Sequence, residues 1–339
     1  MDVLRGYAMV FVVLGHGLIG LISAKIPGVE GWGLSGVILI YLFHIPLLFF
    51  VSGFVSRDRQ KSVRVFLVYT VKWIVAPYII WSIILVLIQN VIPSGANTPI
   101  RLSALFGLLW TPITLFWFLY VLFLVKVSDY VVGRIVKEPI KAALYLIMIG
   151  AVGFEVGGML NQPASLLRKT MCCLFFYGLG RLASEKRNLF DAVMECLERR
   201  RFAVAIAGAC GVAALALVAF LYSNKPDEKL QLLSEPQGWI LVTGTLGIAI
   251  CLIVARRTEP LMMGCWIKRI GMYSMVIYVQ HTIWGAAIRS LLMRAEITHP
   301  ALLIVAIVAG GILFPILWQK IFDSRQLTRF FGIRAVTLP

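Results

Sequence analysis

The chain alternates between long uncharged segments and short segments that hold most of its charge. Each long segment has about 20 residues or more, the length that a helix needs to cross a hydrocarbon layer about 30 Å thick. Two weaker candidates are interrupted by charge: residues 142–160 contain Glu155, and residues 166–182 contain Arg168 and Lys169. The pattern therefore predicts ten crossings. The eight uninterrupted ones are residues 6–24, 31–56, 73–100, 102–125, 202–222, 237–255, 270–288 and 300–319.

Composition agrees with an integral membrane protein. Hydrophobic residues make up 60% of the 339 positions and charged residues 14%, whereas a soluble domain carries about 25% charged residues. No long polar segment, repeat or low-complexity tract divides the chain, so we expect a single domain over residues 1–339. The predicted fold class is all-α, a polytopic bundle of transmembrane helices in a lipid bilayer.

The net charge of +16 is placed in a way that does not require a nucleic-acid partner. With the N-terminus on the inner side, three quarters of the 32 Lys and Arg residues fall in segments that would face the cytoplasm. The positive-inside rule predicts this alternation for a multi-pass protein. We therefore expect both termini to be cytoplasmic.

Arg5 and His16 share one face of the first predicted crossing. Eleven helical residues turn through about 1100°, only about 20° past three full turns, and rise about 16 Å. An Arg at the inner surface therefore places the His near the middle of the bilayer. Ionisable groups are costly at that depth and are usually functional. A purely structural hydrogen bond between helices explains this His less well, because the Arg lies on the same face.

Two further histidines are predicted at the same depth. His44 lies near the centre of the second crossing, and His281 lies about eleven residues into the ninth. Three imidazoles at one level predict a shared cavity, although a hydrogen bond to a neighbouring helix explains His44 or His281 equally well. Pro46 follows His44 by two residues, and it predicts a bend or a local opening of that helix.

Polar side chains line the same two crossings. Tyr278 and His281 continue a face that begins at Ser274, with the i, i+4, i+7 spacing of a helix. In the second crossing Tyr41 and Ser52 are eleven residues apart and share a face. An enzyme, a channel or a proton relay could use such faces. Three histidines could also hold a metal ion. No two of them have i,i+4 spacing, however, and no second carboxylate accompanies them, so we expect no metal.

Two groups of basic residues carry possible binding chemistry. One group follows the second crossing and includes Arg57, Arg64 and Lys72. Such clusters commonly bind anionic lipid headgroups, and they also suit the phosphates of a nucleotide-like donor. The other group is Arg168 and Lys169, which either extend to the membrane surface or contact an anionic acceptor.

These motifs resemble the acyltransferase 3 family of bacterial membrane enzymes. The resemblance extends over essentially the whole chain, but two positions depart from the family pattern. Asp323 stands where many larger members have a Glu, and Lys72 stands where the inner loop often has an Arg. The chain is most similar to the fucose 4-O-acetylase-like branch through Phe43-His44-Ile45-Pro46-Leu47 with Trp117-Phe118-Leu119. The other matching motifs are Arg5-x10-His16, Phe49-Phe50-Val51-Ser52-Gly53-Phe54, Phe176-Tyr177-Gly178-Leu179-Gly180 and Tyr278-Val279-Gln280-His281.

The resemblance implies a ten-helix enzyme of the bacterial inner membrane that moves an acyl group, usually acetyl from acetyl-CoA, to a sugar hydroxyl. It also implies that His16 is catalytic and that Arg5 is its partner toward the donor. We expect acetyl-CoA as the co-substrate and a cell-surface or lipid-linked carbohydrate as the acceptor. The CoA phosphates are expected to bind Arg5 with Arg57, Arg64 and Lys72, and the acceptor to contact His44, Ser52, Tyr278 and His281.

A transporter or flippase of a lipid-linked sugar or of a proton-coupled solute is the alternative function. Such proteins use buried histidines as proton relays and contain broken helices near the middle of the membrane. Pro46 fits this alternative. Binding of acetyl-CoA separates the two functions, because only the enzyme should be stabilised by it.

Overall fold

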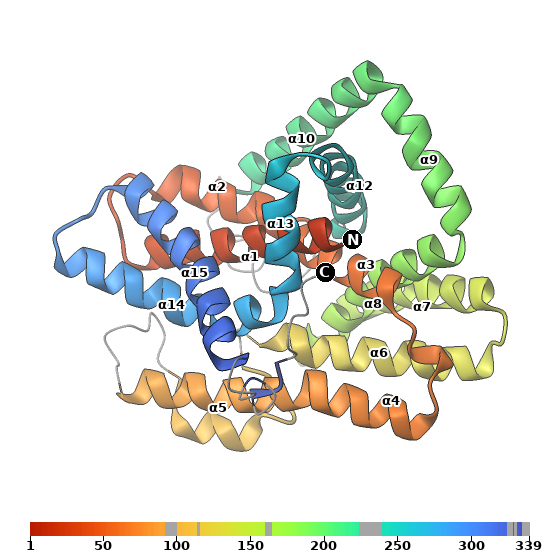
Figure 1. Cartoon of the computed structure of the whole chain (residues 1–339), viewed down its shortest axis with the longest axis horizontal. Helices are drawn as coiled ribbons and strands as arrows, with labels where there is room; N and C mark the ends of the chain where they lie inside the picture. Colours follow the sequence, from red (N-terminus) through yellow and green to blue (C-terminus); the bar gives the residue numbers. More distant parts are fainter. Residues whose placement is uncertain are drawn as a thin grey trace. The chain divides into compact units, whose positions relative to one another are not determined.

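The computed structural model describes residues 1–91, 100–113, 116–159, 165–223, 239–323, 328 and 331–333. Within these residues all regular structure is helical, which confirms the predicted all-α class (Figure 1). In chain order the helices are α1 (Asp2–Ser23), α2 (Glu30–Tyr41), α3 (His44–Val55), η1 (Asp58–Gln60), α4 (Val63–Thr70), η2 (Val71–Val75), α5 (Ala76–Val91), η4 (Leu102–Gly107), α6 (Trp117–Ile135), α7 (Pro139–Met159), α8 (Ser165–Glu185), α9 (Arg187–Arg199), α10 (Arg201–Ser223), α12 (Ile240–Thr258), α13 (Met262–Met272), α14 (Ser274–Arg294) and α15 (Pro300–Asp323).

Six helical segments in the described part of the chain are long and apolar enough to cross a membrane. Each coincides with one of the ten predicted crossings. Helices α8, α10 and α14 overlap three of the others, and α6 covers only the last nine residues of the crossing predicted at 102–125. The six segments are Asp2–Ser23, Glu30–Val55, Val63–Val91, Pro139–Val156, Ile240–Thr258 and Pro300–Asp323.

The predicted crossing 102–125 is not one helix. A short 3₁₀ helix, Leu102–Gly107, comes first, and α6 begins only at Trp117. Pro112 explains the interruption, because its ring disfavours helical geometry in the residue before it and it lacks an N–H donor. The last residues of the predicted crossing 73–100 fall on positions 92–99, outside the described residues.

The chain forms two compact units, each assembled from three separated segments. Unit 1 comprises Met1–Ala8, Ile38–Lys61 and Leu124–Arg269. Unit 2 comprises Met9–Val37, Ser62–Phe123 and Ile270–Pro339.

In unit 1, α8 packs against both α3 and α7, and α12 also packs on α3. Two glycines allow α3 and α8 to approach closely. A Cβ added at Gly53 would lie 2.1 Å from the Tyr177 carbonyl oxygen, and one added at Gly180 would lie 2.0 Å from that of Phe50. The two helix backbones therefore touch, and this contact explains the glycines of the two corresponding sequence motifs.

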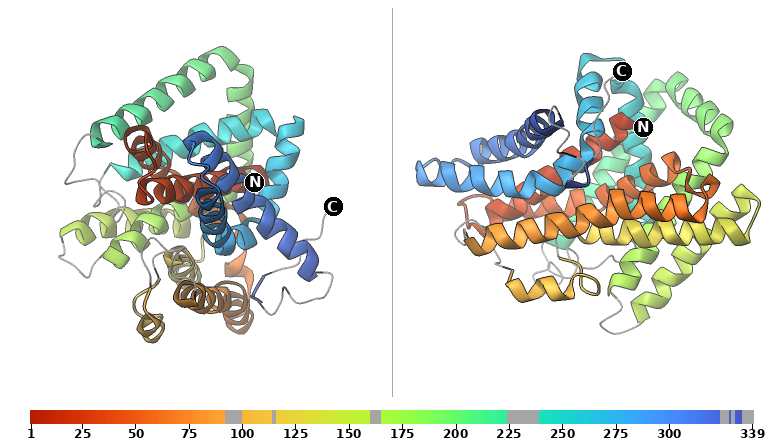
Figure 2. Two further views of the ribbon diagram at one scale, coloured as in Figure 1. Left: turned by 90° about the vertical axis from the view of Figure 1, so that its left-hand side faces the viewer. Right: turned by 60° about the horizontal axis from the view of Figure 1, so that its bottom comes forward.

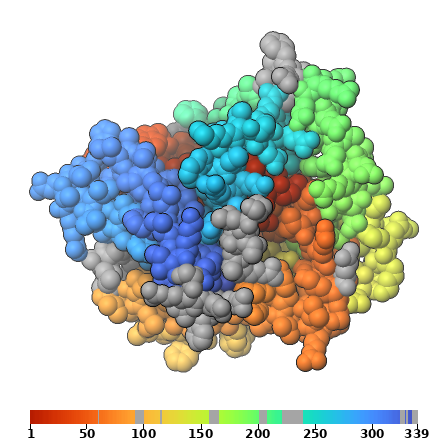
Figure 3. All heavy atoms as spheres, in the orientation of Figure 1, coloured from red at the N-terminus to blue at the C-terminus, as the bar shows by residue number. Residues whose placement is uncertain are grey.

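Helix α9 joins α8 to α10 at the edge of unit 1 (Figure 1). One of its faces packs on α3, since the Phe190 ring lies 5.4 Å from the Phe54 ring. The exposed apolar residues Leu189 and Val193 lie one turn apart on another face. Figure 3 shows α9 on the surface of the molecule.

In unit 2, α14 packs along α15, and α4, η2 and α5 follow one another as a single long helical segment (Figure 2). The middle piece, η2, is a π-helix in which the Ala76 N–H bonds to the Val71 carbonyl, five residues back. Pro77 comes directly after Ala76 and has no N–H to donate. The missing donor accounts for the local change from α to π geometry.

The end of α15 holds the last described residues of the chain. Asp323 accepts hydrogen bonds from Gln319 at 3.3 Å and from the Thr328 hydroxyl. Nearby, the Trp81 indole N–H donates to the Phe331 carbonyl at 3.3 Å, and the rings of Trp81 and Trp318 meet edge to face. Asp323 therefore has a structural role at the position where the family pattern carries a Glu.

Candidate functional site

Two of the predicted histidines meet in unit 2. The rings of His16 on α1 and His281 on α14 have centroids 5.1 Å apart and are tilted by 51°. The approach is possible because Gly311 of α15 has no side chain: a Cβ there would lie 2.9 Å from Val13 and 3.5 Å from the His281 carbonyl oxygen. Helices α1, α14 and α15 thus bring two imidazoles together, as their common predicted depth suggests.

Backbone hydrogen bonds fix the orientation of His281. Its Nδ1 lies 2.8 Å from the Tyr278 carbonyl oxygen and 3.1 Å from that of Ile277. Carbonyl oxygens only accept, so Nδ1 carries the proton and Nε2 carries a lone pair. The residue is 4% exposed, and Nε2 has no hydrogen-bond partner in the described part of the chain. The ring therefore presents a buried, unused proton acceptor.

A cluster of aromatic side chains meets the His281 ring through Tyr278. The Tyr278 ring lies 6.2 Å from the His281 ring, 5.2 Å from that of Phe118 and 6.3 Å from that of Phe116. All three aromatic residues are at most 8% exposed. The sequence motifs around Phe118 and Tyr278, far apart in the chain, therefore meet beside the histidine pair.

Arg5 lies on the same unbroken helix, α1, as His16. The eleven-residue spacing therefore places both on one face, about 16 Å apart along the axis. The Arg5 guanidinium donates to the Asp2 carboxylate at 2.9 Å, and both side chains remain partly exposed. Sequence reasoning missed Asp2 as a partner of Arg5. Its carboxylate partly neutralises the guanidinium charge that we expect to bind the donor.

His44 lies in unit 1, at a break in the second predicted crossing. Helix α2 ends at Tyr41 and α3 begins at His44, so the opening predicted from Pro46 is confirmed. The His44 Nδ1 lies 2.8 Å from the Ile40 carbonyl oxygen, four residues back. The same carbonyl also accepts from the Phe43 N–H at 3.3 Å, so the His44 side chain adds a second bond to the backbone at the break. The His44 ring also lies 4.7 Å from the ring of Tyr41, tilted by 53°.

The other predicted acceptor contacts divide between the units. Ser52 lies on α3 in unit 1, next to the tightly packed Gly53, and Tyr278 lies on α14 in unit 2. The Tyr278 ring lies beside the histidine pair, 6.2 Å from the ring of His281. Ser52 and His44 belong to unit 1, whereas the histidine pair belongs to unit 2.

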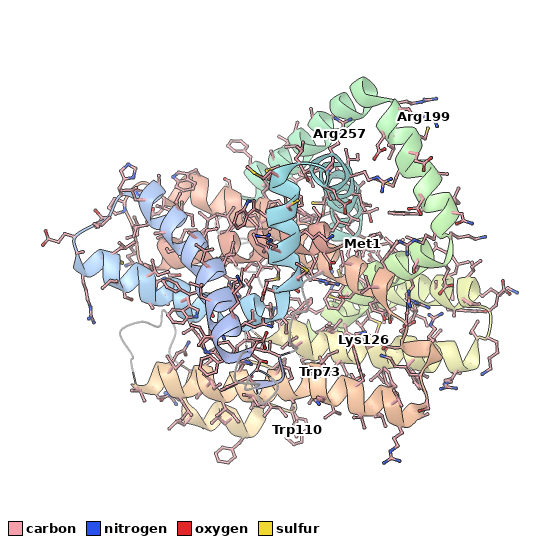
Figure 4. The ribbon with its side chains drawn as sticks, in the orientation of Figure 1. Met1, Trp73, Trp110, Lys126, Arg199 and Arg257 are labelled. Atoms are coloured by element: carbon pink, nitrogen blue, oxygen red, sulfur yellow. The ribbon has the colours of Figure 1, made fainter. Side chains whose placement is uncertain are left out.

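The three basic residues expected to bind phosphate are all exposed. Arg57 precedes η1 in unit 1, whereas Arg64 on α4 and Lys72 in the π-helix lie in unit 2. The Lys72 ammonium lies 5.1 Å from the ring centroid of Trp73, labelled in Figure 4. π-Helical turns often occur at functional positions.

A buried ion pair in unit 1 escaped the sequence analysis. Asp58 of η1 accepts from Lys61 and from Lys126 of α6, each at 2.6 Å (Lys126 is labelled in Figure 4). Burial alone would raise the pKa of Asp58, but the two ammonium groups more than offset it, so this pKa lies below its ordinary value. The carboxylate stays ionised and ties the loop after α3 to α6.

A second buried carboxylate extends the same network. Asp129 of α6 is fully buried, and it accepts from Arg59 Nε at 2.7 Å and from the Tyr177 hydroxyl at 3.0 Å. Arg181 of α8 lies 3.8 Å from it and donates to the Ser56 carbonyl oxygen at 2.6 Å. The signal for this network in the sequence was weak. Asp58 and Asp129 are two of only 16 acidic residues, and each has basic residues close to it in the chain.

Arg289 is a buried cation on α14. It donates to the Gly20 carbonyl oxygen, in the last turn of α1, at 2.9 Å. A Cβ at Gly20 would lie 2.6 Å from the donating nitrogen, so the glycine makes room for this contact. A positive group near the C-terminal carbonyls of a helix is stabilising. Within the described residues, no group of three or more His, Cys, Asp or Glu side chains is placed to hold a metal ion.

Comparison with known proteins gives one result for this arrangement. Residues 1–318 match a family model described as an acyltransferase domain. The match includes α1, α14 and all but the end of α15, and therefore the paired histidines and Arg5. No curated protein and no solved structure matches the chain.

Proposed function

Because the chain belongs to the acyltransferase 3 family, we propose that it transfers an acetyl group from acetyl-CoA to a hydroxyl of a cell-surface or lipid-linked carbohydrate. The protein is an acyltransferase, and its apolar helices are those of a membrane protein. The donor, the acceptor and a location in the bacterial inner membrane are parts of the proposal. The motifs of the fucose 4-O-acetylase-like branch favour a sugar as the acceptor.

The single observation that carries the proposal is the pairing of His16 with His281. Transfer of an acyl group from a thioester to an alcohol needs a group that removes the hydroxyl proton or carries the acyl group. A neutral imidazole does either, since its ordinary pKa lies near 6.5 and its free nitrogen is nucleophilic. Two imidazoles 5.1 Å apart supply this chemistry in one place.

The donor is proposed to enter from the cytoplasmic side. CoA is highly charged at its nucleotide end and slender at its pantetheine arm. Arg5 with the exposed Arg57, Arg64 and Lys72 would bind the phosphates, and the arm would run along α1 toward His16. The spacing of about 16 Å between Arg5 and His16 on one helix face suits an extended arm.

The acceptor is proposed to lie on the other side of the histidine pair. Tyr278 and His281 would orient its hydroxyl, or stabilise the oxyanion that forms as the hydroxyl attacks. His44 and Ser52 remain candidates for the same role. The observed hydrogen bond from His44 to the backbone favours a structural part for that residue.

Release of CoA thiol by the purified protein tests the function. With labelled acetyl-CoA and a glycan or water as the acceptor, wild-type protein should consume the thioester. His16→Ala should lower the rate by at least about 100-fold, because an acid–base group typically contributes 10²–10⁴. The matched control is His299→Ala, which alters an exposed histidine between α14 and α15. An unaffected rate in His16→Ala would remove His16 from the mechanism.

Thermal stability addresses the transporter alternative. An enzyme that binds acetyl-CoA is stabilised by it, whereas a carrier of sugars or protons is not. The broken second crossing is the feature that favours a transporter. The Ile40 carbonyl at the break already bonds to the Phe43 N–H and to the His44 side chain, so the break needs no transported ion to explain it.

A further inference from the structure

We propose that the two histidines divide the reaction, His16 carrying the acyl group and His281 taking the acceptor proton at Nε2. The division rests on the acyl transfer proposed above. It names the atom at which the acceptor binds and the residue that removes its proton, which neither the family match nor the sequence motifs assign.

The state of the His281 ring carries the argument. The two carbonyl oxygens at Nδ1 fix the tautomer, so that Nε2 holds an unshared electron pair. This nitrogen is buried and unpartnered within the described residues. Buried polar atoms are normally hydrogen-bonded, and an exception in a folded protein calls for an explanation. A substrate group that donates a hydrogen bond would provide the missing partner.

The surroundings indicate which donor fits. The Tyr278 ring lies 6.2 Å from the His281 ring, and Phe116 and Phe118 pack on Tyr278 to form a buried aromatic cluster. Both an ammonium and a hydroxyl lose hydration against this cluster, but the loss costs far more free energy for the charged ammonium, so a hydroxyl on a carbon framework is the better fit. Ligand sites commonly combine aromatic walls with a few polar atoms that fix orientation. A sugar, with apolar C–H faces and hydroxyl edges, matches this combination.

The first step acylates His16. Its unprotonated ring nitrogen attacks the thioester carbon of acetyl-CoA, a C–N bond forms and the C–S bond breaks. The CoA sulfur leaves with the electron pair and takes up the proton that the acylated ring releases. The products are neutral acetyl-imidazole and CoA thiol, so atoms and charge balance without another reactant.

The second step transfers the acyl group. The acceptor hydroxyl donates its hydrogen bond to Nε2 of His281, and the proton moves there as the oxygen attacks the acyl carbon. The C–N bond to His16 breaks, and the departing nitrogen takes the proton from the His281 imidazolium. The 5.1 Å separation of the ring centroids makes this return short. An ester leaves, and both histidines regain their starting state.

Two amide substitutions separate the two ring nitrogens. In His281→Asn the amide N–H₂ group can occupy the place of Nδ1 and keep the bonds to the backbone carbonyls, while the Nε2 acceptor is lost. In His281→Gln the amide reaches the place of Nε2 and accepts a hydrogen bond, but it does not take a proton. A residue that serves only as an anchor would tolerate the first change, and one that only positions the acceptor would tolerate the second.

The experiment uses full-length protein, [¹⁴C]acetyl-CoA as the probe and water as the acceptor. Wild-type protein should release CoA in a burst and then turn over. Both His281 variants should keep the burst and retain label, up to about one acetyl group per chain, while steady-state turnover falls by about 10²–10⁴-fold. Mass spectrometry should locate the acetyl group on His16, and His16→Ala should take up none.

Every other outcome contradicts the proposed roles of His16 and His281. Wild-type turnover in His281→Asn would show that only the Nδ1 anchor matters, and wild-type turnover in His281→Gln would exclude proton transfer to this residue. A His281 variant that is stabilised by acetyl-CoA but takes up no label would contradict acylation of His16. If His281→Asn does not fold, the Gln variant still decides. A wild-type protein that neither binds acetyl-CoA nor releases CoA would instead contradict the proposed function itself.

Discussion

Arg59 donates through Nε to the Asp129 carboxylate at 2.7 Å, and this bond joins the turn after α3 to the middle of α6. Asp129 is fully buried and also faces Arg181 and the hydroxyl of Tyr177. The same turn presents Arg57, one of the residues proposed to bind the donor. The buried pair therefore fixes the segment that carries this proposed donor contact.

Replacing the buried carboxylate should destabilise unit 1. Asp129→Asn leaves the Arg59 guanidinium without its counter-ion, whereas Arg181 keeps its ion pair with Glu185 at 2.7 Å. Breaking a buried pair in this way costs about 3–5 kcal/mol. We expect a loss of that order in the free energy of unfolding, measured by chemical denaturation in detergent. Asp191→Asn is the control, because its partner Arg187 lies 3.8 Å away and both side chains are about half exposed. It should change the stability by less than about 0.5 kcal/mol.

The pH dependence of stability should report Asp58. Its pKa is lowered in the folded protein by Lys126 and Lys61 in spite of burial, so folding favours the ionised form. The contribution is therefore fully present above the ordinary aspartate pKa of about 3.9. It is lost as the pH falls through the lower folded value. Melting temperatures recorded from pH 7 to pH 3 should show this loss, and the loss should be smaller in Asp58→Asn. Parallel curves for the two proteins would exclude Asp58 as the cause.

The local parts of this structure could be predicted from the sequence, because they depend on neighbouring residues. Long apolar runs set the helices, and the spacing of Arg5 and His16 sets a shared face once the helix is continuous. Pro46 predicts the break before α3, since a proline removes a backbone donor wherever it lies. The meeting of His281 with His16 was likewise expected from their equal predicted depth.

Contacts between distant segments could not be predicted in the same way. Asp129 meets Arg59 through an approach of η1 to α6 that no periodicity encodes. The bond of His44 to the Ile40 carbonyl depends on the local geometry of the break between α2 and α3. The unused Nε2 of His281 follows from two hydrogen bonds at the other ring nitrogen, and sequence spacing does not specify a tautomer.

Adding one methyl group at the α3–α8 crossing should separate the two helices. In Gly53→Ala the new Cβ would lie 2.1 Å from the backbone oxygen of Tyr177, which has no freedom to rotate away. Overpacking of this kind typically costs about 1–3 kcal/mol, and thermal unfolding in detergent should reveal it. Gly208→Ala on α10 is the matched control, because among the described residues no atom apart from its own helix backbone lies within 4 Å of the added Cβ. Alanine is the better helix former, so the control should be neutral or stabilised by up to about 1 kcal/mol.

Arg5 and Asp2 should affect donor binding with opposite signs. Their side chains bond at 2.9 Å, so Asp2 competes with any phosphate for the guanidinium. Arg5→Gln should raise the KM for acetyl-CoA by about 10-fold or more, because a hydrogen bond to a charged group contributes about 1.5–3 kcal/mol. Asp2→Asn should lower the KM by releasing the guanidinium. Arg57→Gln, at an exposed position, should raise it by less than about 5-fold, and added salt should weaken its effect. Initial rates at varied acetyl-CoA measure all three variants. A higher KM in Asp2→Asn, or a change in kcat alone in Arg5→Gln, would place the donor phosphates elsewhere.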